Sequence, residues 1–183
     1  LRPDDGAAAA VVGGYSFTLS QYNRALQAER QVGSNIKPLI YSAAFEEGLT
    51  LATLVNDAPI NQWNPGSGIA WRPKNSPEVY EGPIRLRKGL AKSKNVVSVR
   101  LIREVGVEKV ADHIAKFGLK RDTIPENESL SLGSLSMTPM EVARAYAVFA
   151  NGGFLVEPYF IDRIEDMDGN TVYKADPVRA CYD

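Results

Sequence analysis

Ser34 and Lys37 form the only serine-x-x-lysine pattern in this sequence, and both side chains are suited to nucleophilic chemistry. Residues three positions apart lie on one face of a helix, so a hydroxyl and an amine at this spacing can meet. Serine becomes an effective nucleophile when an adjacent base removes its proton, and a desolvated lysine can be that base. The alternative is a helix-capping serine followed by a solvated lysine, and the four residues alone favour this alternative.

The residues that follow predict a buried helix, which would position this pair. The run from Pro38 to Gly48 is mostly apolar and closes with glycine. Pro38 cannot donate a backbone hydrogen bond, so it fits only within about the first turn. Ser34 is therefore expected at the helix N-terminus, where free backbone N–H groups can face an oxyanion. Because this helix alone is predicted to be buried all round, its position supports the catalytic interpretation.

Composition sets the broad class of the protein. The chain has 183 residues, of which 44% are hydrophobic and 23% charged, which suits one globular domain with a sizeable core. A formal charge of −1 gives no support to a role with nucleic acid or a membrane surface. His113 and Cys181 are the only histidine and cysteine, which argues against a zinc site or a serine-histidine-aspartate triad, and we expect no metal or cofactor. The absence of an initiator methionine and a signal peptide suggests a piece of a longer protein.

A second polar motif, Ser93-Lys94-Asn95, falls between two predicted helices. The first spans residues 83–92 and begins with Pro83 at its first position, and the second is a buried helix over residues 96–105. Lysine and arginine are concentrated in this part of the chain, which predicts a solvated basic face more than a polyanion site.

The remaining elements are predicted from periodicity and turn residues. Residues 107–115 form an amphipathic helix with His113 off the apolar stripe and exposed to solvent. A capping box starts a helix at Thr138, with Val142, Tyr146 and Phe149 on its core face. Strands are predicted over residues 7–12 and in a hairpin that turns at residues 168–170.

Residues 56–83 form a long segment rich in proline, glycine and asparagine. Loops of this length are usually functional or disordered, and the tryptophans Trp63 and Trp71 argue against disorder. An ordered flap over the core and a wall of a binding cleft are equally good interpretations. In the second of these, Trp71 is a candidate substrate-binding residue.

The two polar motifs carry a resemblance to a known family. Ser-x-x-Lys and Ser-x-Asn are two of the three motifs shared by class A β-lactamases and penicillin-binding proteins. The sequence resembles the transpeptidase domain of class A (bifunctional) penicillin-binding proteins, most closely those of the 1a type. Blocks similar to that family recur in order at residues 12–15, 23–25, 30–38, 54–60, 71–75, 80–87, 93–95, 132–134, 138–139 and 143–153. Val32 stands where the family commonly has proline.

The resemblance implies an α/β (α+β) fold of the serine β-lactamase/DD-transpeptidase type. Residues 1–183 would be the N-terminal part of that domain, with most of its helical subdomain and part of an antiparallel sheet. The third motif, Lys-Thr-Gly or Lys-Ser-Gly, is absent from the sequence, and in the family it lies downstream on a sheet strand. That strand supplies a cation for the substrate carboxylate, and one oxyanion N–H follows it, the other being that of Ser34.

The resemblance also implies a reaction. Ser34 would attack the penultimate D-alanine of a peptidoglycan stem peptide, release the terminal D-alanine and pass the acyl group to an amine of a neighbouring stem. Lys37 would be the general base, which requires a pKa lowered by burial or by a neighbouring cation. Ser93 would relay the proton to the leaving nitrogen, and Asn95 would hold the substrate amide. Lys94, the middle residue of its motif, is expected to point away.

The same family context gives expected partners and location. The partners would be stem peptides, β-lactam antibiotics that acylate Ser34 as substrate mimics, and the rest of the protein as a separate C-terminal chain, but not nucleic acid. The location would be the bacterial periplasm, attached to the inner membrane through upstream segments. Two alternatives remain: a non-catalytic β-lactam-sensing or scaffold domain, and a β-lactamase, which would need a deacylating glutamate loop that residues 126–130 only superficially match.

Overall fold

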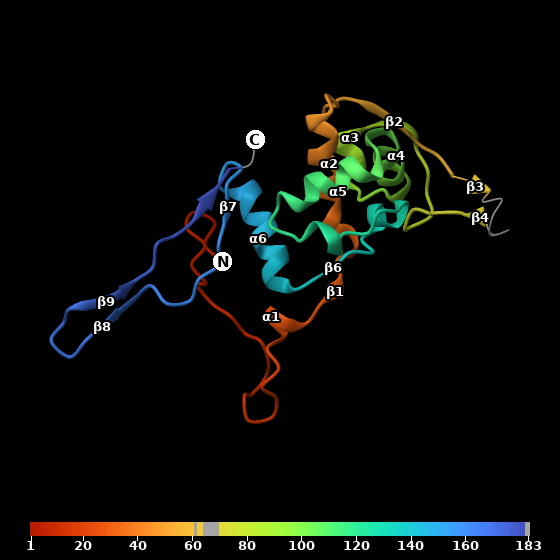
Figure 1. Ribbon diagram of the computed structural model, residues 1–183. Coiled ribbons are helices and arrows are strands. Elements are labelled where there is room, and N and C mark those ends of the chain that lie inside the picture. Colours follow the sequence, from red (N-terminus) through yellow and green to blue (C-terminus); the bar gives the residue numbers. More distant parts are fainter. Residues whose placement is uncertain (61, 64–69, 182–183) are drawn as a thin grey trace. The chain divides into compact units, whose positions relative to one another are not determined.

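Helices and short antiparallel strands divide between two units in the computed structural model, which describes residues 1–60, 62–63 and 70–181 (Figure 1). The first unit comprises Leu1–Arg30, Lys116–Leu119 and Ser136–Asp183, and the second comprises Gln31–Ala115 and Lys120–Leu135. This mixture of helices and antiparallel strands agrees with the predicted α/β (α+β) class.

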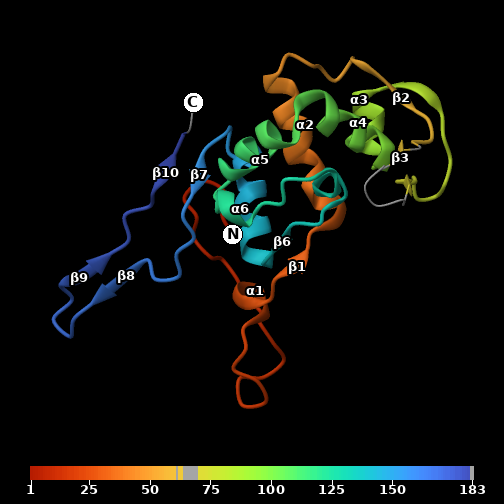
Figure 2. The same cartoon turned by 45° about the vertical axis from the view of Figure 1, so that its right-hand side comes forward.

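The second unit is built around one buried helix. Its helices are η1 (Gly33–Ile36), α2 (Lys37–Glu46), α3 (Leu86–Ala91), α4 (Asn95–Val105), α5 (Val107–Ala115), η2 (Arg121–Thr123) and η3 (Glu128–Leu132). Helix α2 contacts α3, α4 and α5, and the two views show α4 and α5 alongside it (Figures 1 and 2). Its buried residues include Leu39, Ile40, Tyr41 and Ala44, which lie on different sides of the helix. The prediction of a helix buried all round is therefore confirmed.

Two strand pairs flank the helices of this unit. Strand β2 (Leu54–Asp57) pairs with β5 (Gly82–Arg85), and β3 (Gln62–Trp63) pairs with β4 (Ala70–Trp71), both antiparallel. The prediction of a helix beginning at Pro83 is wrong, because Pro83 lies in β5 opposite Asn56 and helix α3 starts at Leu86. Proline is compatible with this place because a two-stranded ladder leaves one side of each strand without a partner.

The first unit contains the shorter helix α1 and the capped helix α6. Its elements are α1 (Arg24–Gln27), β6 (Ser136–Met137), α6 (Pro139–Ala150), β7 (Leu155–Val156), β8 (Arg163–Glu165), β9 (Thr171–Lys174) and β10 (Arg179–Ala180), while β1 (Arg30–Gln31) spans the division between the units. The capping box of Thr138 and Glu141 is confirmed at the start of α6. Strands β8 and β9 form the predicted hairpin, and β7 pairs with β10.

Two further local predictions are wrong. Residues 8–12 form no strand, and Ala7 alone makes a bridge, with Tyr159, because small side chains give a strand little to pack against. On α6 the buried residues are Ala145 and Ala147, whereas Tyr146 and Phe149 are 37% and 45% exposed. The ring of Phe149 makes a tilted contact with that of Phe117 at 5.3 Å between centroids and an edge contact with that of Tyr146 at 6.1 Å.

The prediction that His113 is exposed to solvent is also wrong, since only 7% of the residue is exposed. Helix α5 packs against α2, which covers the face beside the apolar stripe as well as the stripe itself. The imidazole Nε2 lies 2.6 Å from Ser42 Oγ, and Nδ1 lies 3.0 Å from Glu46 Oε2, both on α2. Within the described ranges, none of the helices combines the length and the apolar character needed to span a bilayer.

Candidate active site

Ser34 lies in η1, the tight turn that leads into α2. Gly33 N donates to Gly133 O at 3.2 Å, and Val32 N donates to Leu135 O at 2.9 Å, a bond that proline at this position would lack. Gly133 has a φ of +82°, and a Cβ on it would overlap Gly33 O, so this contact requires glycine. The backbone just before Ser34 is thus held by the residues that follow η3.

Lys37 is the first residue of α2 and is almost completely buried, with 1% of its surface exposed. Its Nζ donates to Ser93 O at 2.6 Å, to Ser93 Oγ at 2.9 Å and to Asn95 Oδ1 at 2.7 Å. The structure therefore brings together three of the predicted site residues from two separate motifs. All three acceptors are neutral oxygens.

This environment lowers the pKa of Lys37 to about 8, because burial removes the water that would stabilise the ammonium ion. Among the described residues, no carboxylate forms an ion pair with Lys37 that would offset this loss. With such a pKa, roughly a tenth of the molecules carry a neutral Lys37 at pH 7. The side chain can thus act as a base at neutral pH.

Ser34 is exposed, and its hydroxyl makes no hydrogen bond with any residue that the structure describes. In a 3-10 turn the side chains at i and i+3 are eclipsed, so Ser34 and Lys37 lie on the same side of the chain. The expected contact between them is not formed here, because the Lys37 amine gives its hydrogens to Ser93 and Asn95. Catalytic hydrogen bonds are often long before substrate binds, so the missing hydrogen bond between Ser34 and Lys37 does not exclude them as nucleophile and base.

Ser93 lies in the turn between α3 and α4, and Asn95 lies where that turn ends. Ser93 has a φ of +51°, a left-handed conformation that costs energy for a residue with a side chain and is common at functional sites. Asn95 is the first residue of α4, and its Nδ2 donates to Lys74 O at 2.8 Å. Both ends of the Asn95 amide are therefore engaged, so a substrate amide would compete with Lys37 or Lys74 for it.

Trp71 packs against the core of this unit. Its ring lies against a cluster of Ile60, Val96 and Val99, and the Arg103 guanidinium lies 5.9 Å from the ring centroid. These contacts agree with the interpretation of this segment as an ordered flap over the core. A role for Trp71 in substrate binding stays a prediction. Trp63 belongs to β3, while residues 61 and 64–69 of the long segment lie outside the described residues.

Lys94 occupies a place that the sequence did not indicate. Its side chain bonds to Asp57, Glu81 and Val79, and only 7% of the residue is exposed, so its assignment to a solvated basic face is wrong. Its Nζ lies 2.8 Å from Asp57 Oδ2, and Asp57 is completely buried. A strand prediction over residues 54–57 would have revealed this aspartate, because the exposed–buried alternation places Asp57 on the same inward face as Val55.

A metal centre has no counterpart in the described ranges, where no group of three or more histidine, cysteine, aspartate and glutamate side chains gathers around one point. The arrangement instead offers an exposed serine three residues before a buried lysine of lowered pKa, with a second hydroxyl and an amide bonded to that lysine. Such a set can activate a serine for attack on a carbonyl carbon.

Residues 1–181 match the model of the penicillin binding protein transpeptidase domain. Penicillin-binding protein 1A of Vibrio cholerae is 53% identical over 182 residues, which are 100% of this chain and 22% of that protein. Penicillin-binding protein 1A of Escherichia coli is 55% identical over 181 residues, 99% of this chain and 21% of that protein. The chain thus spans about a fifth of the length of these curated relatives.

Solved structures of penicillin-binding proteins are also similar to this chain. The crystal structure of penicillin-binding protein 1A from Haemophilus influenzae superposes with a TM-score of 0.93 at 51% identity, over 99% of this chain and 27% of that one. The imipenem acyl-enzyme complex of penicillin-binding protein A from M. tuberculosis superposes with a TM-score of 0.76 at 25% identity, over 87% of this chain and 41% of that one.

Proposed function

Since this chain belongs to the penicillin-binding protein transpeptidase family, we propose that it carries the acyl-serine chemistry of a peptidoglycan D,D-transpeptidase. The observation that carries the proposal is the buried Lys37 amine, held by Ser93 and Asn95 and with a pKa of about 8. A lysine in this state can take the proton of Ser34 at neutral pH.

In the first half of the reaction, Ser34 Oγ bonds to the carbonyl carbon of the penultimate D-alanine of a stem peptide. The Ser34 proton passes to neutral Lys37 and from there through the Ser93 hydroxyl to the leaving nitrogen. The C–N bond then breaks, and the terminal D-alanine departs with the proton. The Lys37 Nζ to Ser93 Oγ distance of 2.9 Å supports this relay.

In the second half, an amine of a neighbouring stem attacks the acyl-enzyme and loses a proton along the reverse route, which restores Ser34 and forms the cross-link. Asn95 would hold the substrate amide through the group that now bonds Lys74 O, and Trp71 would line the cleft. The Ser34 backbone N–H would supply one oxyanion donor.

β-Lactams would acylate Ser34 as substrate mimics. The imipenem acyl-enzyme of the M. tuberculosis relative, at 25% identity, supports this part of the proposal. The family context supports a periplasmic location, with attachment to the inner membrane through upstream segments and with the third motif supplied by a C-terminal part of the same protein.

The experiment that tests the proposal is an intact-mass measurement after incubation with a penicillin, followed by peptide mapping. It is made on the chain itself and on a version extended through a downstream Lys-Thr-Gly motif, each beside its Ser34→Ala variant. A stable adduct on Ser34 that Ser34→Ala abolishes is the expected result. No adduct in the extended version would overturn the proposal.

Two further outcomes distinguish the alternatives. An adduct that hydrolyses rapidly would indicate a β-lactamase. A stable adduct without activity on a stem-peptide analogue would indicate a β-lactam-sensing domain.

A further inference from the structure

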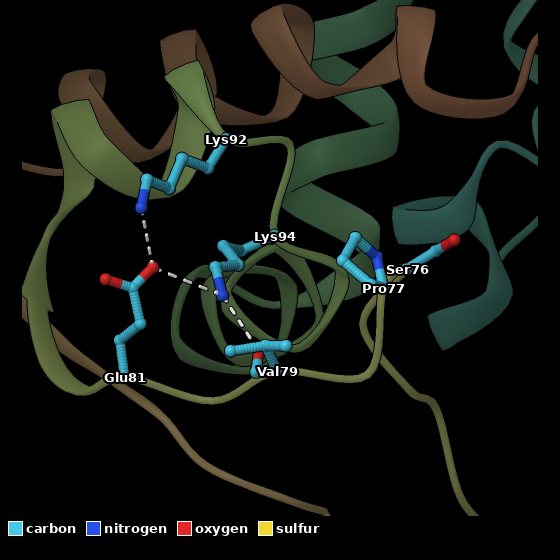
Figure 3. Close-up of a pocket in the computed structure, with 6 residues that line it drawn as sticks. All are labelled: Ser76, Pro77, Val79, Glu81, Lys92 and Lys94. Atoms are coloured by element: carbon cyan, nitrogen blue, oxygen red, sulfur yellow. Dashed lines mark hydrogen bonds and ion pairs between the residues drawn. The ribbon is translucent and has the colours of Figure 1, made fainter.

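Lys94 is the central residue of a second polar cluster, whose members are different from those that surround Lys37. Its Nζ donates to Val79 O at 2.8 Å and forms ion pairs with Asp57 at 2.8 Å and Glu81 at 3.4 Å. Figure 3 shows its bonds to Val79 and Glu81, with Lys92 reaching the same Glu81 carboxylate from outside. A pocket of about 350 Å³ lies beside this cluster, lined by Ser76, Pro77, Val79, Glu81, Lys92 and Lys94.

Asp57 links Lys94 to the start of α4. Its carboxylate accepts from Asn75 Nδ2 at 2.6 Å and from Glu81 N at 3.0 Å in addition to Lys94. Asn75 Oδ1 in turn accepts from Val96 N at 3.2 Å, in the first turn of α4. The network therefore reaches the loop at Lys94 and again one residue after Asn95.

Two separate sets of contacts thus hold the loop. Lys37 binds the Ser93 carbonyl and hydroxyl and the Asn95 amide, and the Asp57 network binds Lys94. The left-handed conformation of Ser93 persists only where its surroundings enforce it. Replacing a buried ion pair by apolar groups is often neutral for stability, so stability alone does not account for this pair.

We propose that Asp57 and Lys94 are positioning residues for the acyl-serine reaction: their ion pair holds the turn that aims the Ser93 hydroxyl and the Asn95 amide at Lys37. The inference rests on the proposed function for its kinetic consequence, but the restraint on the loop is a property of the structure itself. The Lys94 charge is compensated by Asp57 and Glu81, so Lys94 acts through the backbone and not as a cation that tunes Lys37.

The test uses Lys94→Met in the version that extends through the third motif, with Lys92→Met as the matched control. Lys92 pairs with the same Glu81 but lies on the surface, with 53% of its side chain exposed, and makes no contact with Asp57. A misplacement of about 1 Å can lower a catalytic rate by roughly 100-fold. We expect the first-order acylation constant with a fluorescent penicillin to fall by about 10- to 100-fold in Lys94→Met and to stay unchanged in Lys92→Met.

Two readouts separate positioning from a general loss of folded protein. Partial unfolding lowers the fraction of molecules that become acylated, whereas a misplaced loop lowers the rate constant at full amplitude. The pH midpoint of acylation should not move when Lys94→Met is combined with Asp57→Asn, because the two charges of the buried pair are removed together. Lys94→Arg, which keeps the charge, should recover part of the rate. Asp57→Asn added to Lys94→Met should cause little further loss, because the pair is already broken.

Hydrogen exchange keeps the inference testable even if no variant acylates. The N–H groups of Ser93, Lys94 and Val96 bond to Leu90 O, Gly89 O and Asn75 Oδ1. They should exchange faster in Lys94→Met than in Lys92→Met or the parent. Failure of the parent to acylate would overturn the proposed function alone. Unchanged exchange, or an unchanged rate constant in an acylating parent, would overturn the positioning role.

Discussion

Lys37 and Lys94 are both buried and both bind the Ser93–Asn95 loop or belong to it, yet their environments have opposite effects on their charge. Lys37 meets only neutral oxygens, and burial lowers its pKa to about 8. Lys94 meets the carboxylates of Asp57 and Glu81, and the hydrogen bond to Asp57 raises its pKa above the usual value in spite of burial. Burial alone therefore does not decide whether a lysine can be a base.

The difference lies in what each lysine is paired with. Desolvation disfavours the ammonium ion at both sites, but a carboxylate partner reverses the balance at one of them. The chain thus has a lysine suited to proton transfer, Lys37, which bonds to the Ser93–Asn95 loop, and a lysine suited to a permanent ion pair, Lys94, within that loop.

The largest effect is expected from removing the base. Lys37→Met should lower the acylation rate by roughly 1000-fold, within the range for loss of a general base. The same substitution at Lys94 should cost much less, because that lysine is proposed to act only through the loop. Stopped-flow acylation with a fluorescent penicillin measures both, and equal losses would contradict the contrast.

A carboxylate placed beside Lys37 should give it the character of Lys94. Asn95→Asp would convert the acceptor at 2.7 Å from Lys37 Nζ into an anion, which raises the pKa of Lys37. Acylation at pH 7 should fall by about tenfold for each unit by which that pKa rises, and its pH midpoint should move upward from about 8. Asn95→Ala is the control, since it removes the substrate contact without adding a charge. A midpoint that moves equally in both variants would refute the explanation.

Lys37 should also make stability depend on pH in the alkaline range. The folded protein loses this proton at a pH of about 8, whereas the unfolded chain keeps it up to the ordinary lysine value of 10.5. The unfolded state binds more protons between these values, so the free energy of unfolding should rise with pH there by up to about 1.4 kcal/mol per pH unit. Denaturant titrations at pH 8 and 10 should show this rise in the parent and a smaller one in Lys37→Met. Identical slopes would mean that burial does not lower this pKa.

The smallest effect is expected on the outer side of the Lys94 cluster. Lys88 and then Lys92 are the main partners that lower the pKa of Glu81 to about 2 from its ordinary value of 4.5. The stability that Glu81 contributes is present above pH 4.5 and is lost as the pH falls toward 2. Glu81→Gln should therefore only slightly reduce the fall of the melting temperature between pH 5 and pH 3, because this carboxylate is accessible to solvent. A large loss at pH 7 would show instead that Glu81, and not Asp57, holds Lys94.

Helices with strong local signals were predictable from the sequence. The all-round apolar run after Pro38 and the apolar stripe of residues 107–115 correspond to α2 and α5. The capping box at Thr138 correctly marks the start of α6. Each of these signals depends on residues within a few turns of one another, which is why a linear pattern contains them.

Features that depend on distant partners were missed or reversed. Pro83 has the local chemistry of a helix start, but pairing of β5 with β2 draws it into a strand. His113 lies off its apolar stripe, but α2 covers it. Lys94 stands in a basic stretch, but Asp57 is 37 positions earlier in the chain, and no periodicity joins the two.

Local residue patterns were enough to predict the Ser34 and Lys37 pair, its place at the start of a buried helix, and a second motif between two helices. Which of the two lysines can act as a base became clear only in the folded protein. That outcome depends on the partners that folding brings within about 3 Å of each ammonium group, because the energy of a buried charge is set by its nearest dipoles and charges.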